Sequence, residues 1–241
     1  MKLRYMTCTG CDDHTNLDQM LTLQKEFPFL EFGILVHSSK LGLGRYPSER
    51  WLQSLLARRN EFTHLAMHVC GEKTLDFVFK PNKAYSYFAM IAKEFPRIQL
   101  NLPAGYFDRL DINEFIGFFS NLHPHQEIIT QHNKAHENLH IVVGEPNHAV
   151  LFDSSGGRGI TRQSWPTPLP KKENRCGFAG GLSPENLEKE LPLLQAAAGD
   201  QEFWIDMETG VRTNDRFDLS KVRRCAEIVR RCYGEEESGL G

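Results

Sequence analysis

The chain lacks several features that mark specialised classes of protein. It has no apolar run long enough to cross a membrane, and its start, Met1-Lys2-Leu3-Arg4, lacks the apolar segment of a secretory signal. Basic residues are not in excess, because 28 lysines and arginines stand against 31 acidic residues, for a formal net charge of -3. We therefore expect a cytoplasmic protein that binds neither membranes nor nucleic acid.

The chain also lacks a pattern typical of disulfides, metal binding or redox chemistry. Its six cysteines are scattered, which favours free thiols in a reducing compartment. Cys8 and Cys11 have the spacing of a redox motif, but such a motif usually opens a helix in a thioredoxin-like unit. His132, His136 and His140 have helical spacing, yet no carboxylate or cysteine pattern completes a metal site beside them. We predict a solvated face for these histidines, and no metal or cofactor.

What the chain does contain is an alternation of short β-rich runs and longer segments with helical periodicity, in a composition that is 40% hydrophobic. This pattern predicts an α/β fold, a single (β/α)8 TIM barrel over residues 1–233, with residues 234–241 as a frayed acidic tail. The expected strands are Leu3 to Cys8, Leu30 to Val36, Thr63 to Val69, Ile98 to Leu102, Glu127 to Gln131, His148 to Asp153, Arg175 to Ala179 and Phe203 to Met207. The expected helices are Asn16 to Glu26, Ser48 to Arg58, Asn82 to Glu94, Ile112 to Asn121, Pro184 to Ala197 and Leu219 to Cys232.

Two glycine turns follow the last two predicted strands. Gly180-Gly181 precedes Ser183-Pro184, a pair typical of a capped helix start, and Thr209-Gly210 follows the last strand. A glycine pair alone is more often a plain tight turn. In a barrel, however, the loops after the seventh and eighth strands often build one phosphate site, so we predict that these four residues, Gly180, Gly181, Thr209 and Gly210, bind a phosphate.

Two reactive side chains stand at predicted strand ends. Asp153 precedes a glycine-rich loop containing Gly157 and Gly159, and its place at the strand end predicts a carboxylate in the barrel mouth. An Asx turn that only shapes the loop explains Asp153 equally well. Cys8 ends the first strand, where a thiol acts as a base or nucleophile if its thiolate is favoured, or is merely structural.

Taken together, these motifs resemble the phosphoribosylanthranilate isomerase family of tryptophan biosynthesis. The anchors keep their order over nearly the whole chain, and the segment Gly-Gly-Leu-Ser-Pro-Glu-Asn is the most specific of them. The matching residues are Cys8, Arg45-Tyr46, Ile98-Gln99-Leu100, Leu151 to Gly159, Ala179 to Leu187 and Ile205 to Val211.

The resemblance implies a cofactor-free Amadori rearrangement. Cys8 would be the general base, Asp153 the general acid, and Arg45 the group that meets the carboxylate of the substrate's anthranilate. The glycine turns, including Gly157 and Gly159, would hold the phosphate. The chain departs from the family pattern at Thr9, which follows Cys8, so Cys11 is an alternative base.

Further departures leave other functions open. Ile160 replaces the usual lysine after the sixth-strand loop, and Glu208 stands where the family has a serine, beside the expected phosphate. A divergent paralogue that isomerises another phosphorylated metabolite, or binds one without turnover, is the alternative. A phosphosugar aldolase would need a Schiff-base lysine at a strand end, and none is found there. As partners we expect a small phosphorylated substrate and, at most, a second copy of the chain.

Overall fold

The protein is a closed barrel of eight parallel strands, as the sequence predicted. The computed structural model describes residues 2–72, 75, 87–103, 126–132, 147–153, 164–166 and 175–233. Each strand pairs with its neighbours in chain order, and the last strand pairs with the first, which closes the barrel. Two further short strands form a separate antiparallel ribbon after the eighth barrel strand.

The observed strands differ from the predicted ones only at their ends. The sixth, seventh and eighth strands have the predicted bounds, whereas the first continues to Thr9, one residue beyond Cys8. Thr9, and not Cys8, is therefore the last residue of the first strand. The barrel strands are β1 Leu3–Thr9, β2 Leu30–His37, β3 Leu65–Cys70, β4 Arg97–Asn101, β5 Glu127–His132, β6 His148–Asp153, β7 Arg175–Ala179 and β8 Phe203–Met207.

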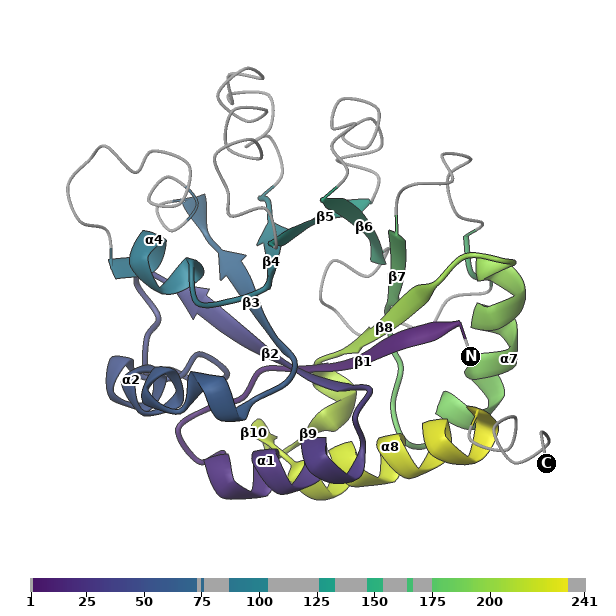
Figure 1. The fold of residues 1–241 in the computed structure, drawn as a ribbon, viewed down its shortest axis with the longest axis horizontal. Coiled ribbons are helices and arrows are strands. Elements are labelled where there is room, and N and C mark those ends of the chain that lie inside the picture. Colours follow the sequence, from purple (N-terminus) through teal and green to yellow (C-terminus); the bar gives the residue numbers. More distant parts are fainter. Residues whose placement is uncertain are drawn as a thin grey trace, which may run out of the picture.

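The described helices cover the outside of the barrel. In Figure 1, α8 runs between α1 and α7, and it contacts both. The expected helix from Ile112 to Asn121 lies outside the described residues, and of the one expected from Asn82 to Glu94 the structure describes only α4. The helices are α1 Leu17–Glu26, α2 Glu49–Ala57, α4 Tyr87–Ala92, α7 Leu187–Ala198 and α8 Leu219–Tyr233, with short 3-10 turns η1 Arg59–Glu61 and η3 Thr209–Val211.

Side-chain caps fix two of the helix starts. Asn16 accepts a hydrogen bond from the Gln19 amide at the start of α1, and Ser48 accepts one from the Trp51 amide at the start of α2. The predicted start of the seventh helix was wrong, because residues 184–186 form a turn and α7 begins only at Leu187. There the turn is held by the Asn186 side chain, which accepts from the Ser183 amide.

The barrel wall separates two different environments. Its outer face packs with the helices into a large apolar core that includes Met6, Phe32, Ile205 and Val229. The inner apolar cluster is small, with Ile129, Ala149, Leu151, Ala179 and Trp204 packed against Tyr5. Much of the interior is polar instead, which is unusual for a barrel, since such interiors are mostly filled with branched apolar residues.

A buried ion network occupies the interior near the N-terminal ends of the strands. Arg97, only 4% exposed, pairs with Glu31 and with Glu127, whose Oε1 lies 2.8 Å from the Arg97 Nε. Arg175 also pairs with Glu127. The Arg97 guanidinium lies between the rings of Tyr5 and Trp204, 4.7 and 4.6 Å from their centroids. The interior below the barrel mouth is therefore filled by arginine and glutamate side chains that pair with one another.

Among the residues that the structure describes, no helix combines the length and the apolar character needed to cross a membrane.

Candidate functional site

Two carboxyl groups point into the barrel at the carboxyl ends of β6 and β8. Asp153 pairs in register with Ala179 on β7, and Ala179 pairs in register with Asp206 on β8. Register partners on neighbouring parallel strands point to the same face of the sheet. Because Ala179 belongs to the inner cluster, Asp153 and Asp206 also point into the barrel. Both are buried, at 4% and 8% exposure.

Asp206 has the electrostatic character of a proton-transfer group. Burial raises the pKa of its carboxyl to about 8, the negative charges of Glu208 and Asp153 act in the same direction, and the Thr9 hydroxyl opposes them. That hydroxyl donates a hydrogen bond of 2.7 Å to the Asp206 Oδ1. A carboxyl group that exchanges its proton near neutral pH is suited to general acid–base catalysis.

Thr9 and His68 crowd around Gly33 at the inner wall of the mouth. A Cβ at Gly33 would lie 2.2 Å from the Thr9 Oγ1 and 3.1 Å from the His68 Nε2, so only glycine leaves room for these two side chains. Burial, followed by the charge of Arg97, lowers the pKa of His68 to about 3. His68 is therefore a neutral polar neighbour at physiological pH and takes no part as a cation.

Cys8 does not lie in the mouth, contrary to the interpretation of its position from the sequence. Thr7 and Thr9 point inward, to Glu31 and Asp206, so the strand alternation turns Cys8 outward. It is fully buried in the apolar core next to Cys225 of α8, and burial raises the pKa of its thiol well above the usual value. A thiol in this place has neither the access nor the ionisation that a base requires.

Cys11, the alternative base, is excluded from the mouth in the same way. It is also fully buried in the outer core, and burial together with the neighbouring Asp12 carboxylate raises the pKa of its thiol well above the usual value. Thr9 thus occupies the mouth position that we had expected a thiol to fill. The alternation of polar residues at Tyr5, Thr7 and Thr9 was the signal for this in the sequence.

The two glycine turns of the predicted phosphate site are in direct contact. Gly180 and Gly181 have φ angles of 128° and 66°, in a region that side chains disfavour, which explains the glycine pair. A Cβ at Gly210 would lie 2.0 Å from the Leu182 carbonyl oxygen. The turns after β7 and β8 therefore pack backbone against backbone, with Thr209 exposed beside them. Gly157 and Gly159 lie outside the described residues.

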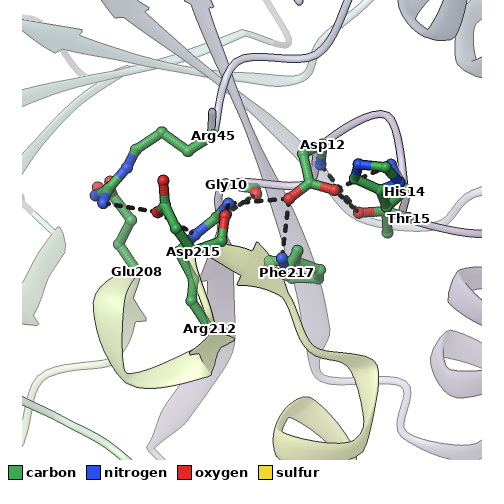
Figure 2. A network of polar contacts seen from close by, with 9 residues as sticks. All are labelled: Gly10, Asp12, His14, Thr15, Arg45, Glu208, Arg212, Asp215 and Phe217. Carbon is green, nitrogen blue, oxygen red and sulfur yellow. Dashed lines mark hydrogen bonds and ion pairs between the residues drawn. The ribbon is translucent and has the colours of Figure 1, made fainter. Parts of the chain in front are cut away.

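Arg45 lies at the mouth, between β2 and α2, but its guanidinium is already paired. Its Nη1 contacts the Glu208 Oε1, and its Nη2 lies 3.5 Å from the Asp215 Oδ1 (Figure 2). Glu208 is thus turned toward Arg45, which resolves its unfavourable placement beside a phosphate site. Asp215 stands in the turn between β9 Arg212–Thr213 and β10 Arg216–Phe217, where Asn214 and Asp215 have φ angles of 50° and 56°, as in a tight hairpin turn.

A buried strut joins this hairpin to the loop after β1, and sequence reasoning missed it. Arg212 donates to the Gly10 carbonyl oxygen at 2.5 Å and to the Asp12 Oδ2 at 2.9 Å, and Asp12 also accepts from the Phe217 amide at 2.9 Å (Figure 2). Asp12 in addition accepts from the His14 amide at 3.0 Å. The residues that lengthen this loop are therefore used to hold β1, β9 and β10 together.

The described residues support neither a metal site nor the Schiff-base lysine of an aldolase. Across these ranges no group of three histidine, cysteine or carboxylate side chains converges as a metal site would require. The eight described barrel strands also contain no lysine, so none of their ends offers a Schiff-base nitrogen.

Comparisons with known proteins give a fold and no closer assignment. No family model matches the chain, and no curated protein matches it. Among solved structures, it is similar to phosphoribosyl anthranilate isomerase from Thermotoga maritima, with 15% identity, coverage of 96% of this chain and 100% of that one, and a TM-score of 0.55.

Two further structures extend this result. A phosphoribosyl anthranilate isomerase in complex with reduced 1-(o-carboxyphenylamino)-1-deoxyribulose 5-phosphate matches with 15% identity, 95% and 99% coverage and a TM-score of 0.58. A phospho-2-dehydro-3-deoxyheptonate aldolase from Thermotoga maritima matches with 12% identity, 96% and 70% coverage and a TM-score of 0.56. The chain thus has the barrel fold of the phosphoribosyl anthranilate isomerases, as its sequence motifs implied, at an identity that marks it as divergent from them.

Proposed function

We propose that this barrel is an isomerase that carries out the Amadori rearrangement of an N-linked ribose phosphate. The first reaction to assay is that of the phosphoribosyl anthranilate isomerases, which share this fold. It converts N-(5-phosphoribosyl)anthranilate to the 1-deoxyribulose 5-phosphate product in tryptophan biosynthesis. The observation that carries the proposal is the pair of inward carboxyl groups, Asp153 and Asp206, with the pKa of Asp206 raised to about 8. We further propose that the protein acts in the cytoplasm.

The two carboxyl groups divide the proton transfers between them. Asp153 donates a proton to the ribose ring oxygen, the bond from that oxygen to C1 breaks, and the nitrogen lone pair forms the iminium. The Asp206 carboxylate then removes the proton from C2, and the electrons of that bond form the C1–C2 double bond while the nitrogen becomes neutral. The Asp206 carboxyl group then returns its proton to C1 while the C2 hydroxyl gives its proton to the Asp153 carboxylate, which forms the ketone and restores both side chains. The rearrangement opens the ring and transfers protons with no net oxidation or reduction, so it needs no cofactor.

The remaining contacts position the substrate. The Thr9 hydroxyl keeps the Asp206 carboxyl oriented through its 2.7 Å hydrogen bond. The glycine turns at Gly180-Gly181 and Thr209-Gly210 are proposed to hold the phosphate through backbone amides, as glycine turns commonly do. Because the two turns touch, one phosphate can contact both.

The experiment compares purified wild type with Asp153→Asn, Asp206→Asn and Cys8→Ser, following the loss of fluorescence of the anthranilate substrate. Each aspartate variant should lose a factor of about 100 to 10,000 in kcat with little change in KM. Cys8→Ser should retain kcat, since Cys8 faces the outer core. In the wild type, kcat/KM should change with pH around 8, where Asp206 titrates, and Asp206→Asn should remove this dependence.

A binding protein without turnover is the second candidate. It is favoured by the outward placement of Cys8 and Cys11, the two thiols that the sequence offered as bases. Tight binding of a ribose phosphate analogue, with no turnover of any N-linked ribose phosphate and no rescue of a tryptophan auxotroph lacking the isomerase, would establish this candidate and overturn the enzyme.

A further inference from the structure

The charged groups around Arg45 bear on which substrate the mouth accepts. Arg45 is held from two directions, by Glu208 just after β8 and by Asp215 in the β9–β10 turn (Figure 2). The side chains of Arg45 and Glu208 are 30% and 25% exposed, so both remain within reach of a ligand that enters the mouth. We refer to these three residues as the Arg45 clasp.

The clasp lies beside the carboxyl group that is proposed to act as the base. Glu208 is two residues beyond Asp206, and a Cβ at Gly10 would lie 3.7 Å from both the Arg45 Cβ and the Glu208 Cγ. Gly10 in turn directly follows Thr9, the partner of Asp206. A substituent on the anomeric nitrogen, held next to Asp206, therefore has the clasp as its neighbour.

The clasp and the adjoining strut have no spare positive charge. Arg212 is engaged by Asp12, by Asp215 and by the Gly10 carbonyl oxygen, so its donors face inward. In this network the two guanidinium groups of Arg45 and Arg212 face three carboxylates. An entering carboxylate would have to displace Glu208 from Arg45 and would leave that acid unpaired beside it, which opposes binding.

We propose that Glu208 determines substrate choice by serving as the internal counterion of Arg45. The site then accepts an N-linked ribose phosphate whose nitrogen substituent is uncharged or cationic, and it discriminates against one that bears a carboxylate. This inference rests on the proposed function and specifies its substrate class. Among candidate substrates it ranks a neutral amide relative above N-(5-phosphoribosyl)anthranilate itself.

The test uses two stable secondary amines, made by reductive amination of ribose 5-phosphate with anthranilate and with 2-aminobenzamide. They differ only in a carboxylate against a neutral amide, and calorimetry gives Kd for each. Wild type should bind the amide at least about tenfold more tightly. Glu208→Gln should bring the ratio of the two Kd values close to one or invert it, because Arg45 is then free to pair with the ligand's carboxylate.

Asp200→Asn is the matched control. It also removes one carboxylate, but from an exposed pair with Lys2 whose partners belong to neither the clasp nor the mouth, so it should leave the ratio unchanged. If wild type binds both analogues equally, or if Glu208→Gln leaves the preference intact, the inference is overturned while the proposed function stands. If neither analogue binds to folded wild type, the proposed function fails and the inference fails with it.

Discussion

Replacing Asp206 by asparagine should stabilise the protein, and more so as the pH rises. In the unfolded chain the carboxyl group ionises with its ordinary pKa of 3.8, whereas in the folded barrel burial raises the pKa to about 8. Between these two values the folded state binds a proton that the unfolded state releases. The stability contributed by this proton is fully present below pH 3.8 and is lost as the pH rises toward about 8.

The magnitude follows from the same two values. Across the interval in which only the folded state is protonated, stability falls by about 1.4 kcal/mol for each pH unit. From pH 5 to pH 9 the fall is therefore about 4 kcal/mol, because the group is fully ionised in both states above about pH 8. Asparagine has nearly the same size and still accepts the hydrogen bond from Thr9, but it does not ionise.

The assay is urea unfolding of wild type and Asp206→Asn at pH 5 and pH 9. Subtracting the two proteins at each pH removes the titration of every other group that they share. The stability advantage of the variant should be about 4 kcal/mol larger at pH 9 than at pH 5. A difference below about 1 kcal/mol would refute the reasoning, since it would mean that water reaches the carboxylate and that burial does not hold its pKa near 8.

Two further predictions concern the loops of the mouth. Gly210→Ala should raise KM for a phosphorylated substrate strongly with a smaller effect on kcat, because a Cβ there would lie 2.0 Å from the Leu182 carbonyl oxygen and force the turns apart. Gly199→Ala strains the backbone, because Gly199 has a φ of 61°, but its Cβ would meet nothing within 4 Å, so it controls for a general loss of stability in the same kinetic assay. Equal effects of the two variants on KM would contradict a phosphate site between the turns. Asp12→Asn should lower the free energy of unfolding by about 3 kcal/mol, because it leaves the Arg212 guanidinium buried without its main counterion. Chemical denaturation measures this loss, and a change below about 1 kcal/mol would mean that Asp215 suffices as the partner of Arg212.

Part of this protein is determined by local sequence alone. The alternation of strands and helices specified the eight-stranded barrel, and β6, β7 and β8 have the bounds that the sequence predicted. Parallel strands joined by helices bring all their carboxyl ends to one rim, so Asp153 and the two glycine turns could be placed at the mouth from their positions in the chain. These features depend on residues that are close together in the chain, so the local sequence is enough to predict them.

Only the tertiary structure decided which side chains face into the mouth. The polar alternation of Tyr5, Thr7 and Thr9 marks one face of β1, but only the structure shows that this face is the interior, where Glu31 and Arg97 make the surroundings polar. Because adjacent residues of a strand point to opposite faces, a shift of one residue at the end of β1 puts Thr9 in the mouth and Cys8 in the outer core. The pairing of Arg45 with Glu208 likewise joins residues far apart in the chain, and their ion pair exists only because the closed barrel brings β2 and β8 to the two sides of β1.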